Sequence, residues 1–151
     1  MKDNSKSTEA KKLYLSALKD ARKKSFDKKA TAKKLLEASN LGANEATYAL
    51  ASWYLHGTHF DQDIPKGIRL LKAACKAGNA SACFDLAYSF EVGAGVAKNP
   101  ERAFQLYMEA SMRGDKEATR HVARCLWHGI GAPKNRILAD LWGKGVSFSM
   151  E

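Results

Sequence analysis

The sequence predicts an all-α protein, a solenoid of about four helix–turn–helix repeats with a step of 36 residues. One observation is an apolar stripe at helical spacing inside each repeat. The other is the recurrence of small and polar residues at that step, in four series: Gly42, Gly78 and Gly114; Gly57, Gly93 and Gly129; Ala10, Ala46, Ala82 and Ala118; Asp27, Asp63, Asn99 and Asn135. Each unit of such a stack buries its apolar face against its neighbours.

The first helix of each repeat is expected to carry the apolar stripe. In the third repeat the stripe consists of Ala82, Leu86, Ala87 and Phe90. The glycines at 57, 93 and 129 are expected to end these helices in a left-handed conformation. The second helices are expected to begin after Asp63, Asn99 and Asn135, because their side chains accept hydrogen bonds from free amide groups.

The repeats define the predicted domain organisation. We expect residues 1–7 to form a disordered tail and residues 8–151 to form a single solenoid domain. Its repeats are 10–45, which lacks the loop glycines and is degenerate, 46–81, 82–117 and a truncated 118–148. The truncated repeat exposes apolar surface around Trp142, Val146 and Phe148, which a C-terminal turn, a second copy or the ligand could cover.

The formal net charge of +9 is concentrated in residues 1–37, which hold 12 Lys and Arg against 5 Asp and Glu. No apolar run approaches the roughly 18 residues of a membrane span. No apolar stretch of the kind found in secretory signals precedes Leu13. These features predict a cytoplasmic protein, unless the sequence has been trimmed.

The repeats resemble the Sel-one-like repeat family, which is related to tetratricopeptide repeats. In the third repeat the matching residues are Ala82, Leu86, Phe90, Gly93, Gly95, Val96, Asn99, Arg102, Ala103, Ala110 and Gly114. The second repeat departs from the pattern at His59, where the family has its second loop glycine. The resemblance covers roughly residues 30–145 and implies a right-handed α/α superhelix with a scaffold or adaptor role.

The first-helix face opposite the apolar stripe is predicted to bind a protein partner. The candidate residues are Tyr48, Ser52, Leu55, Phe84, Tyr88, Glu91, Arg120, Arg124 and Trp127. Tyr, Trp and Arg are the residue types enriched at binding hot spots. In related solenoids this face is concave, so we hypothesise a groove for an acidic or amphipathic protein segment. The alternative is that the superhelix buries part of this stripe against its own neighbours.

Cys75 and Cys83 lie on the two sides of the Gly78–Asn79 turn and are a candidate disulfide. Their spacing resembles the bridge of a cysteine-rich branch of the family, some of whose members are secreted and associated with β-lactam binding. In a reducing cytosol the same thiols are small core residues. The equivalent positions in neighbouring repeats hold Ser39 with Thr47 and Ser111 with Thr119.

No convincing active site is visible, and we expect neither a cofactor nor a metal. His121, Cys125 and His128 have a spacing that could bind zinc, but helix packing also explains them. Ser16 and Lys19 match the S-x-x-K motif without its companion motifs. The basic residues that could contact phosphates are Arg22, Lys23, Lys24, Lys28, Lys29, Lys33 and Lys34, with only Phe26 among them for base stacking.

The favoured hypothesis is a non-catalytic, bacterial protein-interaction module, either a monomer or a weak dimer. It would act as an adaptor or scaffold, or as an immunity-type inhibitor that neutralises a toxin. One alternative is an exported cysteine-rich repeat protein associated with β-lactam or cell-wall binding. Another is nucleic-acid binding through the basic N-terminal repeat.

Overall fold

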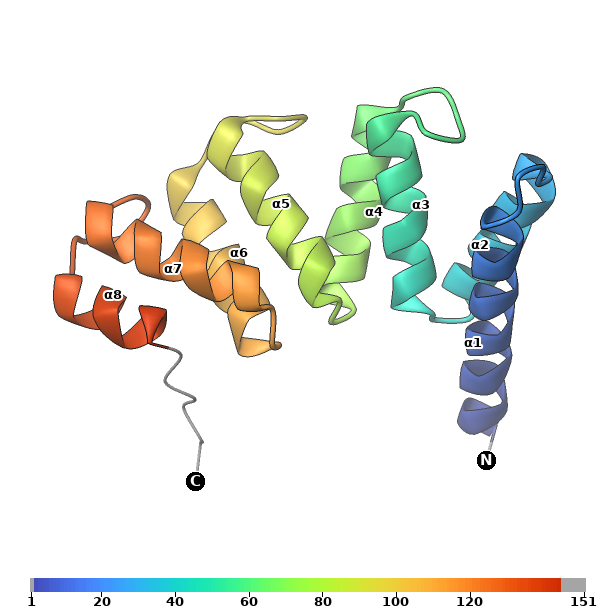
Figure 1. The fold of residues 1–151 in the computed structure, drawn as a ribbon, viewed down its shortest axis with the longest axis horizontal. Coiled ribbons are helices and arrows are strands. Elements are labelled where there is room, and N and C mark those ends of the chain that lie inside the picture. Colours follow the sequence, from blue (N-terminus) through green and yellow to red (C-terminus); the bar gives the residue numbers. More distant parts are fainter. Residues whose placement is uncertain (1, 145–151) are drawn as a thin grey trace. The chain divides into compact units, whose positions relative to one another are not determined.

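The computed structural model describes residues 2–144, and every regular element in that range is a helix (Figure 1). The all-α prediction is therefore confirmed. None of these helices is both long enough and apolar enough to cross a membrane. The helices are α1 (Lys2–Ala21), α2 (Lys28–Asn40), α3 (Asn44–His56), α4 (Ile64–Lys76), α5 (Ala80–Val92), α6 (Pro100–Met112), α7 (Lys116–His128) and α8 (Arg136–Gly143).

The chain divides into two compact units, unit 1 at Met1–Gly78 and unit 2 at Asn79–Glu151. In unit 1, α1 packs on α2, α2 on α3 and α3 on α4. In unit 2, α5 packs on α6, α6 on α7 and α7 on α8. Each unit therefore contains two helix–turn–helix repeats in which neighbours along the chain are neighbours in space. The single domain boundary at 8–151 stays a prediction.

The 36-residue step is a step between helix starts. The first helices α3, α5 and α7 begin at residues 44, 80 and 116, and the second helices α2, α4, α6 and α8 begin at residues 28, 64, 100 and 136. The predicted limits at 46, 82 and 118 fall two residues late. The reason is that they were placed on the alanine series, which occupies the third position of each first helix.

The predicted start and stop signals are confirmed. Gly57, Gly93 and Gly129 end the first helices with φ angles of 64°, 80° and 74°, in the left-handed region. Each second helix is capped by an Asp or Asn side chain that accepts a bond of 2.9–3.0 Å from the amide three residues on. These caps are Asp27, Asp63, Asn99 and Asn135.

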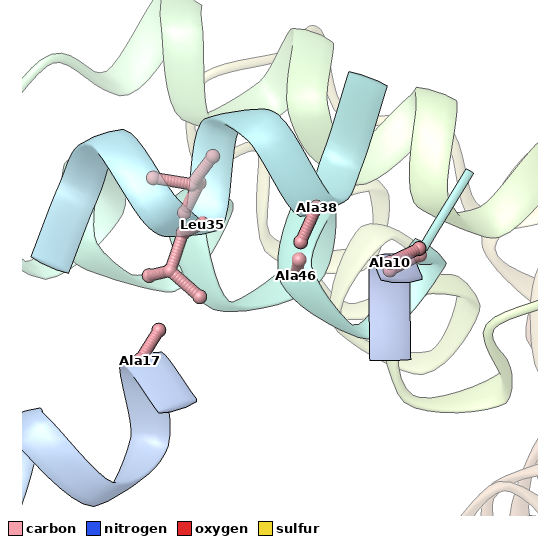
Figure 2. Close-up of a cluster of buried hydrophobic side chains, with 7 residues drawn as sticks. Ala10, Ala17, Leu35, Ala38 and Ala46 are labelled. Carbon is pink, nitrogen blue, oxygen red and sulfur yellow. The ribbon is translucent and has the colours of Figure 1, made fainter. Parts of the chain in front are cut away.

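Alanine allows the helices of unit 1 to approach closely. Figure 2 shows Ala10 and Ala17 of α1 near Leu35 and Ala38 of α2, with Ala46 of α3 in the same cluster. All five side chains are at most 2% exposed. Small residues bring the helix backbones together, and leucine side chains fill the space between them. This cluster fastens the degenerate first repeat to the second.

The predicted disorder of residues 1–7 differs from the structure, because α1 begins at Lys2 and has 20 residues. The segment contains neither Gly nor Pro, and Thr8 Oγ1 donates a 2.8 Å bond to the Asn4 carbonyl within the helix. At the other end, α8 has 8 residues against 13 in α4 and α6. Val146 and Phe148, predicted to border an exposed apolar surface, lie outside the described residues.

Candidate partner-binding site on the first helices

Two aromatic side chains of unit 2 that belong to the predicted binding face are exposed. Tyr88 on α5 is 52% exposed and Trp127 on α7 is 41% exposed. The Arg136 guanidinium carbon lies 5.2 Å from the Trp127 ring centroid, which supports one face of the indole. Arg120 is also exposed, and its Nη1 lies 2.6 Å from Glu117 Oε2. These groups combine apolar area with directed polar atoms at the surface.

Two other predicted residues, Glu91 and Arg124, pair with each other. Arg124 Nη2 donates to Glu91 Oε1 at 2.6 Å, and the Tyr107 hydroxyl donates to Glu91 Oε2 at 2.7 Å. Both carboxylate oxygens are therefore used inside unit 2. The pair joins α5 to α7, and Tyr107 joins both of them to α6.

Aromatic contacts extend this junction to Phe84. The His121 ring stacks on Tyr107 at 4.6 Å between centroids and meets Phe84 edge-on at 5.2 Å. Phe84 also lies 5.5 Å from Tyr107. Phe84, Glu91 and Arg124 thus hold α7 against α5 and α6, which is the packing alternative stated for this stripe. A partner contact by these three residues stays a prediction.

The electrostatics of the junction follow from its geometry. Burial raises the pKa of Glu91, but the hydrogen bonds from Tyr107 and Arg124 outweigh it and leave that pKa below its ordinary value. Burial, with Arg124 nearby, lowers the pKa of His121. Because Arg124 can only donate, His121 Nδ1 accepts their 3.3 Å contact. At neutral pH the junction therefore contains a carboxylate, a guanidinium and a neutral imidazole.

The predicted residues of unit 1 are partly used in packing. A Cβ atom added to Gly67 of α4 would stand 2.5 Å from Leu55 Cγ, so Leu55 fills the space that this glycine leaves. The Ser52 carbonyl accepts a 2.9 Å bond from His56 Nδ1 on the same helix. Tyr48 is half-buried. A continuous groove that includes these residues stays a prediction.

Tyr107 was not identified from the sequence. The side chain is fully buried, and this burial, followed by the hydrogen bond to the Glu91 carboxylate, raises the pKa of the Tyr107 hydroxyl. A signal was available in the repeat register. The equivalent second-helix positions hold Leu35, Leu71 and Gly143, so Tyr107 is the member with a polar atom.

An aromatic cluster in unit 1 was also missed. The His59 ring lies 4.2 Å from the Trp53 ring and 5.0 Å from the Phe26 ring, both in edge-on geometry. Phe60 stacks on Tyr54 at 4.9 Å. The signal was the replacement of a loop glycine by His59 beside these aromatic residues. Burial, followed by the charge of a nearby lysine, lowers the pKa of His59.

The hydroxyl pairs at the turns show how equivalent positions meet inside each unit. Ser39 and Thr47 oxygens lie 2.6 Å apart, and Ser111 and Thr119 oxygens lie 2.6 Å apart. The Cys75 and Cys83 disulfide, predicted at the same register positions, stays a prediction. Among the residues considered for zinc, Cys125 is a buried free thiol whose pKa is raised by burial, while His128 is exposed.

The profile of the Sel1 repeat family matches residues 44–79, 80–115 and 116–139, and these matches begin where α3, α5 and α7 begin. The chain belongs to the Sel1 repeat family. Sel1 repeat proteins generally mediate protein–protein interactions, and the family is generally non-catalytic.

Curated relatives with similar sequences are fungal. Chitin synthase regulatory factor 3 of Schizosaccharomyces pombe is 30% identical over 100 residues, which are 62% of this chain and 11% of that protein. Chitin synthase regulator SKT5 of Saccharomyces cerevisiae is 33% identical over 84 residues, 54% of this chain and 12% of that protein. The chain thus spans a small fraction of both relatives. Bacterial origin stays a prediction.

Solved structures confirm the solenoid repeat fold. A Sel1 repeat protein from Oxalobacter formigenes superposes with a TM-score of 0.71 at 29% identity, covering 74% of this chain and 84% of that one. The protective antigen c5321 of uropathogenic Escherichia coli gives 0.83 at 20% identity, over 95% of this chain and 31% of that one. Cysteine rich protein B of Helicobacter pylori gives 0.65 at 23%, over 74% and 86%. The last two likenesses concern the fold alone.

Proposed function

We propose that this Sel1 repeat protein is a non-catalytic adaptor or regulatory module that binds a protein partner through the exposed aromatic residues of its first helices. The observation that carries the proposal is the exposure of Tyr88 and Trp127, at 52% and 41%, on α5 and α7. A partner that covers them gains apolar area and two polar atoms at a small entropic cost, because each side chain has few rotatable bonds.

The fixed junction behind these rings supports the proposal. Glu91 and Arg124 link α5 to α7, and we expect this link to restrict movement of the two exposed helix faces before binding. A preorganised surface loses less conformational freedom on association than a mobile one. Arg120, exposed on the same helix as Trp127, adds a cation for an acidic partner segment.

The names of the curated relatives favour a regulatory role over a toxin-neutralising one. They describe regulators of chitin synthase, proteins that act on another protein. Because the chain corresponds to 11% and 12% of their lengths, we do not carry their target over to this protein. A cytoplasmic location, proposed with this role, stays a prediction.

The test compares three alanine variants of one unit. Tyr88→Ala and Trp127→Ala remove the exposed rings, whereas Met112→Ala removes a 72% exposed apolar side chain from the second helix α6. A partner identified by affinity purification and then purified itself should bind each aromatic variant about 30-fold more weakly, equal to about 2 kcal/mol. Its affinity for Met112→Ala should be unchanged. Wild-type affinity in both aromatic variants, with helix content intact by circular dichroism, would refute the proposal.

A further inference from the structure

The last two helices of unit 2, α7 and α8, border a groove of 380 Å³. Ala123 and Trp127 line it from α7, and Ala139, Gly143 and Lys144 line it from the other side. Four lining residues are small or aromatic and four are ionisable; the ionisable ones are Arg124, His128, Asp140 and Lys144. The preceding repeat shows what kind of element covers this surface.

In the preceding repeat, the corresponding surface of α5 and α6 is covered by α7. His121 of α7 stacks on Tyr107 of α6 at 4.6 Å, and Arg124 of α7 reaches Glu91 of α5 at 2.6 Å. The surface between the two helices of one repeat is therefore the surface on which the next helix packs. The groove between α7 and α8 is the equivalent packing surface of the fourth repeat.

In the fourth repeat, different residues stand at the two positions that contact the next helix in the third repeat. Counting 36 residues on, Glu91 is replaced by Trp127 and Tyr107 is replaced by Gly143. A Cβ atom added to Gly143 would meet one described atom within 4 Å, the Ala123 Cβ at 4.0 Å. Within residues 2–144, the space that a phenol ring fills in the third repeat is therefore open. An indole beside an open space fits a bulky apolar side chain.

The charges of the last two repeats indicate which side chains a helix bound in this groove would carry. Residues 80–115 hold 3 Lys and Arg against 5 Asp and Glu, and residues 116–144 hold 6 against 2. The basic helix α7 thus packs on an acidic repeat, and the Arg124–Glu91 ion pair is a direct contact between their opposite charges. The basic fourth repeat is complementary to an acidic helix.

The same charge argues against the first helix of a second copy of this chain as the occupant. The first helix α1 would bring Lys11, Lys12 and Lys19 to a repeat that is already basic. Like charges brought together at an interface are unfavourable. Asp140 is the one acidic residue of the lining, and exposed Lys144 lies on the same side of the groove.

We infer that the groove between α7 and α8 binds an amphipathic helix of a protein partner, with a bulky apolar side chain against Trp127 and Gly143 and acidic side chains toward Lys144. The inference rests on the proposed function and adds the binding mode and the chemistry of the partner segment. Helix-in-groove recognition places apolar anchors on one face of the helix and leaves the flanking positions for charge.

Two variants test the groove with little risk to the fold. Gly143→Leu fills the open space, and because Gly143 is the last residue of α8 in helical backbone, leucine is compatible with the helix. Lys144→Glu reverses the exposed charge. Ile137→Ala is the matched control, since Ile137 is 79% exposed on α8 and does not line the groove.

The probe is a synthetic helical peptide of about 15 residues with Leu at i, i+4 and i+7 and Glu at the flanking positions. A second peptide carries Lys in place of every Glu. By calorimetry, the acidic peptide should bind the wild type and the Ile137→Ala variant equally, and bind Gly143→Leu and Lys144→Glu at least about tenfold more weakly. The basic peptide should bind the wild type at least about tenfold more weakly than the acidic one.

Equal binding of the two peptides, no binding of the acidic peptide to the wild type, or unchanged binding to Gly143→Leu would each overturn the inference. The purified partner separates this failure from failure of the proposed function. If the partner is lost from Tyr88→Ala but retained by Gly143→Leu, the groove is wrong and the protein-binding role stands. If the partner survives both aromatic substitutions, the proposed function itself is wrong.

Discussion

The Tyr107→Phe substitution should reveal how much the junction of α5, α6 and α7 contributes to the stability of unit 2. Phenylalanine keeps the ring that His121 stacks on and removes the hydroxyl that donates to Glu91 at 2.7 Å. Tyr107 is fully buried, so water does not replace the lost bond on its side. The change therefore isolates one hydrogen bond to a charged acceptor.

The expected loss is about 1.5 kcal/mol. Hydrogen bonds to charged groups contribute about 1.5–3 kcal/mol, and the lower end applies because the Glu91 side chain retains Arg124 and is 19% exposed to water. Urea unfolding followed by circular dichroism would measure the difference as a shift in midpoint at constant slope. Tyr88→Phe, an exposed tyrosine on α5, is the control and should leave the midpoint unchanged.

The pH dependence gives a second measurement. The pKa of Glu91 is lowered in the folded protein, so its pairing stabilises the fold above the ordinary carboxyl pKa of about 4.3 and is lost as pH falls through the folded value. The gap between wild type and Tyr107→Phe should therefore be full at pH 7 and shrink below about pH 4. Equal stability at pH 7, or a gap that is the same in acid, would refute the reasoning.

Three other expectations follow from single positions. Gly131→Ala should lower the free energy of unfolding by more than about 2 kcal/mol, because φ is 66° and the new Cβ would stand close to the Pro100 carbonyl oxygen. The control Gly114→Ala, where φ is 97° and the Cβ would meet open space, should lower it by only about 1–2 kcal/mol. Equal losses in the two variants would contradict the close approach at Gly131. Asn99→Ala should lose about 1 kcal/mol in thermal unfolding through the missing α6 cap, and no loss would show that the cap is dispensable. Hydrogen bonds from two lysines lower the pKa of Asp20 to about 2, which NMR titration should detect. The stabilising effect of these bonds should be present above about pH 4 and lost toward pH 2. An ordinary pKa would rule out these bonds in solution.

The helix boundaries could be predicted because their signals are local. A cap such as Asn99 acts on an amide three residues away, and Gly93 ends a helix through its own φ angle of 80°. Neither signal depends on a distant segment. The start of α1 at Lys2 was missed because the first repeat extends beyond the 36-residue frame that carried the prediction.

The candidate site could be predicted only in part. The face of α5 and α7 was identified by helical spacing, and Tyr88 and Trp127 are exposed on it. Which members pack inward depends on partners 16 and 33 residues away, Tyr107 and Arg124 for Glu91. Spacing along one helix cannot show that a carboxylate and a guanidinium on different helices meet.

Several turns between these helices are closed by their own residues; Asp115, for example, caps α7 with its side chain, and Gly129 ends that helix. These turns are compatible with the gain or loss of whole 36-residue repeats, but contacts between repeats, such as Arg124 with Glu91, would change with them. The order of the repeats is a different matter. A duplicate of the basic fourth repeat placed after itself would bring two basic repeats together, which is electrostatically unfavourable, so charge as well as shape restricts the order of the repeats.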